Sequence, residues 1–562
     1  MSGIIGKLSF ECDEALARPA LEQMLDLSRR SHEVAKADIY QAPGIALGST
    51  APLYDPVGPS GVRAALDGTL ANERELRAEL RRLGLDVPTG GAALVGRAYE
   101  AWGERCFARF DGAFACAIWD ARERRLLLAR DQIGLKPLYF ALLHGHGVVF
   151  ASELRALFAD PGVERTWCAE AIDAYLALGY VPAPLTAFER ISKLEPAQFI
   201  VVDGRRLHAA QYWDPPAARP ATSGDAGVRE VEALIRMATR DQRIDPDCVV
   251  LYSGGDASSA LLAELPQGAA PVVTVAFDQA SGELARIYAA GQQLGRRPEI
   301  EEAAVETPAL ASQLAAHFDE PIADPSAVTQ YAVCALASRY AASAIGGHGA
   351  TALLVPPRRC AVWDDPIRRG IYTRTFAWQV RELDPRSRMR DISAARGAAE
   401  PLERARYVQV RSVLPESTLA IAGRAALAAG LALHLPWLDR RLVEAAAAVP
   451  APRPQDSSLL RRMLARHLPP SLMPPASPSP PPDWLRSTLA AMVPAVLLAP
   501  RFDGRGVVSR PALRQLWEEH QGGRHDHSLR FWSLLMLELW LREHIDGDAA
   551  DRPLEYAVLK AA

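Results

Sequence analysis

The sequence predicts two domains of different fold class, an α+β sandwich followed by an α/β domain with a doubly wound parallel sheet. The chain has 562 residues, which is more than one hydrophobic core usually serves. A stretch rich in Pro, Ala, Gly and Ser at 214–227 is the best candidate for a linker. Before it, interleaved strands and helices indicate a layered sandwich. After it, fully apolar strands separated by helices indicate a parallel sheet, so we expect domains at residues 1–213 and 228–562.

The expected elements of the first domain include an N-terminal strand and a hairpin. GIIGKLSF predicts the first strand, and FDGAFACAIWD and RRLLLARD predict a hairpin that turns at ARER. GVVFASELRAL predicts a strand followed by a helix. NERELRAELRRLG and ALVGRAYEAWG predict two further helices, the first of which is capped at Gly84.

In the second domain, CVVLYSGG predicts a short buried strand that enters a glycine turn, and ASSALLAEL predicts the helix after it. PVVTVAFD predicts another buried strand. The Ala-rich segment 420–435 predicts a buried helix, and PPSLMPPASPSPPPDW predicts a loop because its prolines exclude a helix.

Composition excludes several classes of function. The net charge is -4 without a long basic run, so we expect neither nucleic acid nor a membrane surface as a partner. The 7 cysteines are scattered without metal-ligand spacing, which predicts reduced thiols in the cytoplasm and no metal-binding residues. The N-terminus lacks the pattern of a signal peptide, and no segment is long and apolar enough to span a membrane.

Several longer motifs carry a family resemblance. RRLLLARDQIGLKPLYF, FASELRAL and DAYLALGYVPAPLTAFERISKLEPAQ resemble asparagine synthetases and their class II glutamine amidotransferase relatives. HFDEPIADPSAV, LPWLDRRLVEAAAAVP and HDHSLRFWSLLMLELW continue the match through the second half. The resemblance implies an Ntn-type glutaminase domain joined to an ATP-pyrophosphatase (PP-loop) synthetase domain, with ATP and Mg²⁺ as the family's cofactors.

The resemblance implies that the catalytic positions of the glutaminase domain are altered. Ser2 stands where the family has a nucleophilic Cys, whose base is the free α-amine. The family's Asn-Gly oxyanion pair corresponds to Asp67 and Gly68. An acidic side chain at this position is expected to repel a developing oxyanion.

The resemblance also implies that the residues with which the family binds glutamine are replaced in this domain. The family's arginine clamp for the glutamine carboxylate aligns with GST around Gly48. The residues that hold the substrate amine align with Gly, Gly, Ala and Ala at 90–93. Asp111 is retained, but it sits at a tight strand turn where a structural role would also explain it. We therefore expect no glutaminase activity.

The phosphate loop of the second domain keeps its framework. In the family it reads S-G-G-x-D-S-S, and its backbone N–H groups bind phosphate at a helix start. Here the loop residues are Ser253, Gly254, Gly255, Asp256, Ala257, Ser258 and Ser259. The acid has moved one position toward the N-terminus, which predicts that Asp256 does not hold Mg²⁺ where the family does.

The other charged positions of this domain are lost. The family's second signature, S-G-x-G-[AG]-D-E, aligns with 346–352, where Gly347 and Gly349 remain but both acids are replaced. His348 is not an expected substitute, since Mg²⁺ prefers oxygen ligands. The Lys and Asp of T-K-x-D-R are absent at 420–424, and two further lysines align with Ser457 and Ala476. We expect weak or absent binding of ATP and Mg²⁺.

These losses favour a pseudoenzyme that acts as a partner or scaffold, as a homodimer or as a heterodimer with an intact homologue. The first alternative is an ATP-dependent amide-forming synthetase with a rearranged site, such as a cyclase that closes a β-lactam or macrolactam. The second alternative is an ordinary asparagine synthase. The sequence names no substrate or pathway for either.

Overall fold

The computed structural model describes residues 3–11, 18–28, 37–56, 61–217, 225–241, 248–266, 270–276, 282–302, 307–355, 362–397, 399–449, 458–475 and 483–547. The chain forms two compact units. The first comprises Met1–Arg165, Ala183–Pro216 and Asp439–Glu444, and the second comprises Thr166–Pro182, Ala217–Leu438 and Ala445–Ala562. Each unit is therefore assembled from more than one stretch of sequence.

The first unit contains two antiparallel sheets. The order of the first sheet is β2 (Asp38–Ala42), β3 (Ile45–Ser49), β1 (Ile4–Ser9), β8 (Gly147–Ala151), β7 (Tyr139–Leu143) and β9 (Ile191–Lys193). The order of the second is β11 (Arg206–Gln211), β10 (Gln198–Asp203), β6 (Arg125–Arg130), β5 (Gly112–Asp120) and β4 (Val62–Leu70). The predicted hairpin is confirmed as β5 and β6, which pair antiparallel with Asp120 opposite Arg125.

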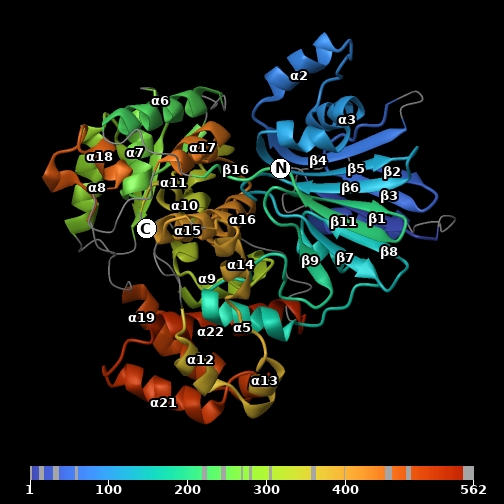
Figure 1. The fold of residues 1–562 in the computed structure, drawn as a ribbon. Helices are drawn as coiled ribbons and strands as arrows, with labels where there is room; N and C mark the ends of the chain where they lie inside the picture. Colours follow the sequence, from blue (N-terminus) through green and yellow to red (C-terminus); the bar gives the residue numbers. More distant parts are fainter. Residues whose placement is uncertain are drawn as a thin grey trace. The chain divides into compact units, whose positions relative to one another are not determined.

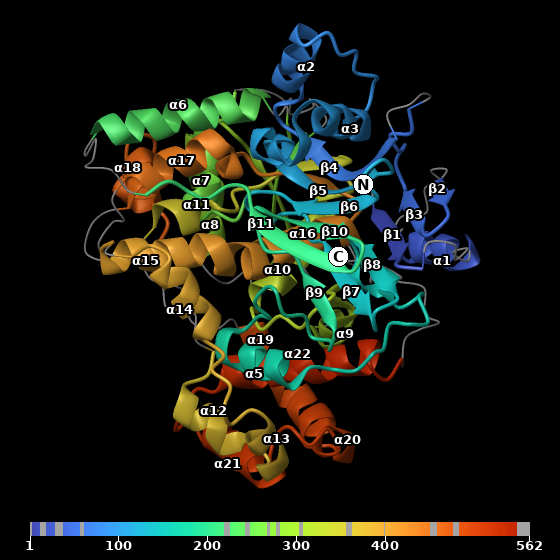
Figure 2. The same ribbon diagram turned by 45° about the vertical axis from the view of Figure 1, so that its right-hand side comes forward.

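Alternation along the strands gives this unit its layers. One apolar core joins inward residues of both sheets, among them Ile4, Leu47, Phe150 and Leu128. A second core lies between the β4–β5–β6 sheet and the helices α2 (Glu73–Arg82) and α3 (Gly91–Trp102). Figures 1 and 2 both show α2 and α3 over β4 and β5. Helices α1 (Arg18–Ser28) and α4 (Leu154–Leu157) pack on the first sheet, which makes the predicted helix-flanked sandwich.

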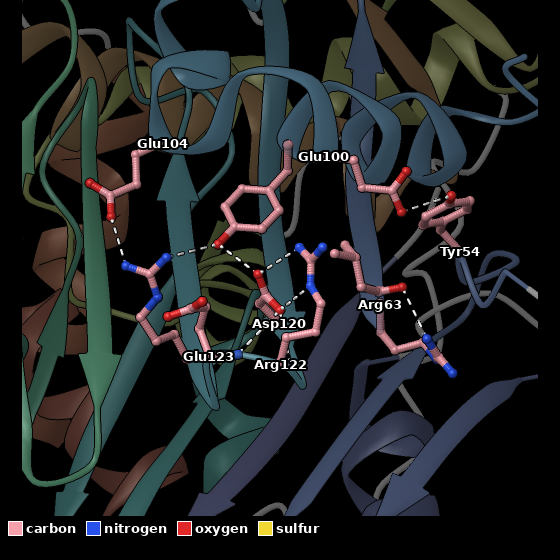
Figure 3. A network of polar contacts seen from close by, with 10 residues as sticks. Tyr54, Arg63, Glu100, Glu104, Asp120, Arg122 and Glu123 are labelled. Atoms are coloured by element: carbon pink, nitrogen blue, oxygen red, sulfur yellow. Dashed lines mark hydrogen bonds and ion pairs between the residues drawn. The ribbon is translucent and has the colours of Figure 1, made fainter. Parts of the chain in front are cut away.

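A polar network fixes the turn between β5 and β6 (Figure 3). The carboxylate of Asp120 accepts hydrogen bonds from the backbone and guanidinium of Arg122 at 3.0–3.1 Å and from the Tyr99 hydroxyl at 3.3 Å. Arg125 in turn reaches Tyr99 and Glu104. Burial acts to raise the pKa of Asp120, but the hydrogen bonds from Arg122 outweigh it, so the pKa is lowered. The ionised carboxylate therefore stabilises the hairpin.

The second unit is built on a parallel sheet. Its order is β14 (Pro298–Glu302), β13 (Val272–Ala276), β12 (Cys248–Leu251), β15 (Ser343–Ile345) and β16 (Ala432–His434), and every pairing is parallel. Helix α10 (Ser326–Ala337) packs against β12 and β13. Both views show α12 (Asp365–Ile371), α13 (Arg374–Gln379) and α21 (Arg510–Gln521) grouped together, away from this sheet. The predicted fold class is confirmed in both units.

The remaining helices are mostly short. They are α5 (Ala169–Leu178), α6 (Asp225–Asp241), α7 (Asp256–Glu264), α8 (Gly282–Gln293), α9 (Thr307–His317), α11 (Ala350–Leu354), α14 (Ser387–Ala394), α15 (Pro401–Val408), α16 (Ala420–Ala428), α17 (Arg440–Ala448), α18 (Leu459–Leu464), α19 (Asp483–Met492), α20 (Pro500–Asp503) and α22 (Ser528–His544). A π-helical stretch, η2 (Gln409–Leu419), joins α15 to α16. Within the described ranges, no helix is long and apolar enough to cross a bilayer.

Two expectations about element boundaries are corrected. The Ala-rich segment is not one helix, because α16 ends at Ala428 and the chain then forms β16. Gly430 has φ +69°, a conformation that ends the helix and that glycine adopts without strain. Helix α6 begins at Asp225, inside the stretch expected to be linker.

Candidate functional site

The candidate site of the second unit lies where the strand order of the parallel sheet reverses. From β12 the chain adds β13 and β14 on one side, and later β15 and β16 on the other. Ligands of doubly wound folds bind outside the carboxyl ends of the strands at such a reversal. The loop after β12 and the loop after β15 are in contact, since a Cβ on Gly347 would lie 2.9 Å from backbone atoms of Ala257 and Ser258. The two predicted signatures therefore meet.

The phosphate loop has its expected position between β12 and α7, and its polar groups bond to one another. The Ser253 and Ser258 hydroxyl oxygens lie 3.0 Å apart, and the Gly255 N–H donates to Ser253 Oγ at 3.4 Å. Ser258 Oγ also donates to the Gly255 carbonyl at 3.3 Å. Ser259 continues the helix through its N–H bond to Gly255, and Gly254 has φ +68°. The hydroxyls of Ser253 and Ser258 thus bond within the loop.

The displaced acid of this loop has an arginine partner. Asp256 begins α7, and its Oδ1 accepts a contact of 3.3 Å from Arg461 Nη1. The same guanidinium nitrogen donates to the Pro474 carbonyl at 2.9 Å, and Arg286 donates to the Gly254 carbonyl at 3.3 Å. Burial raises the pKa of Asp256, while Arg461 acts to lower it. In this structure the carboxylate of Asp256 is paired with the guanidinium of Arg461.

The second loop is filled by its own histidine. A Cβ on Gly346 would lie 2.8 Å from Nδ1 of His348, so the imidazole occupies the space that a side chain at 346 would need. His348 Nε2 lies 3.0 Å from Gln330 Oε1, and its buried Nδ1 has no hydrogen-bond partner in the described part of the chain. Burial lowers the pKa of His348 to about 4. The ring is therefore neutral near neutral pH.

Three further signature positions lie in the described ranges. Thr351 and Ala352, which the resemblance aligns with the acids of the second signature, lie on α11. Arg424 of the third signature is buried in an ion pair with Asp319. Ser457 and Ala476, which align with lysines, lie outside the described residues.

The site residues of the first unit fall into four groups, of which Asp111 is the last. Ser2 lies outside the described residues, but the chain beside it is anchored. The Gly3 N–H donates to Thr50 Oγ1 at 2.7 Å, and the Ile4 N–H donates to Ser152 Oγ at 3.1 Å. Hydrogen bonds therefore hold the chain in place from Gly3 onward.

The second group is the oxyanion pair on β4. Asp67 is buried, and Lys136 Nζ lies 3.0 Å from its Oδ1. This lysine was missed by sequence reasoning, because 69 positions separate the two residues. The positive charge of Lys136 offsets the negative charge of Asp67. Asp67 would therefore repel a developing oxyanion less than the sequence predicts. Gly68 has φ +104°, and a Cβ there would lie 2.0 Å from the Ala113 carbonyl, so only glycine fits.

The third group comprises the positions that align with the family's substrate clamps, where apolar neighbours are close. A Cβ on Gly48 would lie 2.8 Å from Ile5 and 3.1 Å from Leu25. A Cβ on Gly91, at the start of α3, would lie 2.5 Å from Leu66. Strand β3 is buried along its whole length and carries no charged residue. Gly48 and Gly91, which the resemblance aligns with the family's glutamine clamps, are thus surrounded by apolar side chains.

Asp111 precedes β5 in a turn held by Asn72. The Asp111 N–H donates to Asn72 Oδ1 at 3.1 Å, and Asn72 Nδ2 donates to the Arg109 carbonyl at 2.8 Å. Burial, together with the nearby carboxylate of Asp439, raises the pKa of Asp111 to about 6. The backbone of Asp111 therefore helps to hold this turn in place.

Known proteins match both halves of the chain. The family model described as glutamine amidotransferase domain matches residues 1–213, and the model described as asparagine synthase matches residues 230–542. The chain is 27% identical to a putative asparagine synthetase [glutamine-hydrolyzing] of Mycobacterium tuberculosis, with 86% of this chain and 85% of the relative covered. It is 24% identical to asparagine synthetase [glutamine-hydrolyzing] 1 of Bacillus subtilis, over 84% of each.

Among solved structures, a glutamine phosphoribosylpyrophosphate amidotransferase from B. subtilis matches 62% of this chain and 81% of its own, with 12% identity and a TM-score of 0.25. That likeness is too low to carry an argument. The family models and the full-length relatives are sufficient by themselves. With an asparagine synthase match over more than half of its length, preceded by a glutamine amidotransferase domain, the chain belongs to the asparagine synthetase family.

Proposed function

We propose that this chain is a pseudoenzyme of the asparagine synthetase family, which acts as a protein partner or scaffold after both of its chemistries were lost. The observation that carries the proposal is the packing at three glycines. The family resemblance implies polar side chains at Gly48, Gly91 and Gly346. In this chain, neighbouring side chains occupy the space in which those side chains would lie. A polar side chain like the family's would overlap these neighbours unless they moved.

The charges of the second unit support the same proposal. Adenylation needs groups that neutralise phosphate charge as it develops. The described residues offer Arg286 and Arg461 near the loop, but Arg461 already pairs with Asp256. The acids that hold Mg²⁺ in the family are replaced by Thr351 and Ala352. Loss of one such contact typically costs about 3 kcal/mol in the transition state, on the order of a hundredfold in rate.

The competing proposal is an ATP-dependent amide-forming synthetase with a rearranged site. The position of Ser253–Ser259 at the reversal of the sheet supports this alternative, since ligands of such folds bind there. An ordinary asparagine synthase is favoured only by the names of the relatives. Both alternatives need the second unit to activate a carboxylate.

Exchange of labelled pyrophosphate into ATP separates these proposals. The purified full-length chain is incubated with Mg²⁺, ATP and a panel of carboxylates including aspartate, and an intact homologue serves as the positive control. We expect no exchange above background and weak or absent binding of Mg²⁺-ATP. Exchange at a rate typical of enzymes would replace the pseudoenzyme with the synthetase.

Association tests the partner role directly. Light scattering of the chain, alone and mixed with an intact homologue from the same organism, is expected to reveal a homodimer or a heterodimer. A monomer that ignores the homologue at all concentrations tested would contradict the scaffold role.

A further inference from the structure

Three metal-ligating side chains converge in the second unit, away from the phosphate loop. Glu232 lies on α6, Glu264 is the last residue of α7, and His467 follows α18. One ligand atom of each, a carboxylate oxygen or an imidazole nitrogen, lies within 4.8 Å of the others. Their positions in sequence have no metal-ligand spacing, so only the fold brings them together.

The two carboxylates of this cluster are deeply buried. Glu232 and Glu264 are each 5% exposed, whereas the side chain of His467 is 37% exposed. A buried carboxylate is costly unless a cation compensates it. The cluster therefore needs counter-charges, and the exposed imidazole leaves a path from solvent.

Two arginines supply these positive charges, and a metal ion can take their place. Arg466 Nη1 donates to both carboxylate oxygens of Glu232 at 2.9 Å, and Arg236 Nη1 donates to Glu264 Oε2. The side chains of Arg466 and Arg236 are 50% and 46% exposed. Half-exposed arginines lose little when they turn back to water, so a cation can take their place beside the two glutamates.

The other oxygen of Glu264 faces the imidazole at the separation expected for two ligands of one metal ion. Glu264 Oε1 lies 3.5 Å from His467 Nε2, which is long for a hydrogen bond. Two ligands about 2.1 Å from a tetrahedral zinc ion lie about 3.4 Å from each other. The separation of Glu264 Oε1 and His467 Nε2 is therefore already close to that of two ligands of one zinc ion.

We propose that Glu232, Glu264 and His467 bind a divalent transition metal, for which Zn²⁺ is the best fit, with water as a fourth ligand. An imidazole nitrogen beside two carboxylates favours zinc over Mg²⁺ or Ca²⁺. The ion would join α6, α7 and α18, and α7 is the helix that begins at the phosphate loop. The role is structural, and it does not depend on the proposed loss of chemistry.

Zinc titration of the untagged full-length chain tests the site, by calorimetry and by the visible spectrum of bound Co²⁺. We expect the wild type to bind one ion, and His467→Ala and Glu264→Gln to bind it at least about tenfold more weakly. His208→Ala, at an exposed position on β11, is the matched control and should bind as the wild type does. No binding by the wild type at micromolar zinc, or unchanged binding by His467→Ala, would overturn the proposal.

A variant of the competing arginine distinguishes a metal site from a plain ion-pair network. Arg466→Ala removes the present partner of Glu232, so zinc should bind more tightly and raise the unfolding temperature more than it does in the wild type. If the network only holds the helices together, Arg466→Ala lowers the unfolding temperature and zinc does not restore it. That second result would also overturn the proposal.

Discussion

The elevated pKa of Asp111 predicts that its carboxylate destabilises the folded chain at neutral pH. The folded-state pKa is about 6, against an ordinary value of 3.8. Each unit of pKa difference corresponds to about 1.4 kcal/mol, so the ionised form would cost about 3 kcal/mol if the group were fully buried. Because this side chain keeps partial contact with solvent, we expect about 1–2 kcal/mol.

The sign of the pH dependence follows from proton binding. The folded state holds this proton more tightly than the unfolded state does. The penalty is therefore complete above the folded pKa of about 6, shrinks as the pH falls, and is absent below the unfolded value of about 4. Asp111→Asn keeps the shape of the side chain and cannot ionise, so it should stabilise the protein at pH 8 and help about half as much at pH 5.

Urea and thermal unfolding of the full-length chain at both pH values measure the effect. A gain of 1 kcal/mol raises the unfolding temperature by about 2–4 °C in a unit of this size. Asp203→Asn is the control, since it removes an exposed carboxylate from the end of β10 in the same unit. The reasoning is refuted if Asp111→Asn is no more stable than the wild type at pH 8, or if its gain is the same at both pH values.

Three further outcomes are expected, the first under the proposed function and the other two from the structure. Ser2→Cys should leave glutamate release from glutamine at background, because a thiol does not restore the substrate clamps; robust hydrolysis by either form would show that the clamps come from elsewhere. Gly346→Ser should destabilise the chain by about 1–3 kcal/mol through its overlap with His348, and His348→Ala should relieve that loss in the double variant, where strict additivity would disprove the contact. Asp120→Asn should cost about 1–3 kcal/mol at pH 7, and because the pKa of Asp120 is lowered, the gap to the wild type should close as the pH falls below about 4, as acid unfolding would measure.

Local patterns predicted the elements whose signals are contained in a few residues. The apolar run of β12 followed by two glycines predicted the strand, the loop and the helix start that the structure has. The hairpin of β5 and β6 followed in the same way from two apolar strands around ARER. In both cases the burial pattern and the turn residues agree with the tertiary structure.

Pairings between distant residues were not predictable from those patterns. Lys136 neutralises Asp67, and Arg461 neutralises Asp256 across 205 positions. The Ala-rich segment misled for a related reason, because its helix propensity is high whereas its last part, Ala432–His434, is needed as the edge strand beside β15. Tertiary context decided each of these cases, and a single sequence does not contain it.

Under the proposed function, the contrast between the replaced charges and the retained core favours released chemistry over general decay. Catalytic groups are costly to stability, since they bring charges together in a confined site, and substitutions that remove them are often stabilising once activity is not selected. Under the proposed function, Gly48 and Gly91 fit this account because apolar side chains now close over them. General decay would have reached the core as well, yet Trp437 and Trp540 remain fully buried within the second unit. A binding or scaffold role requires selection that maintains packing without maintaining the charges of a catalytic site, because a partner recognises the folded surface.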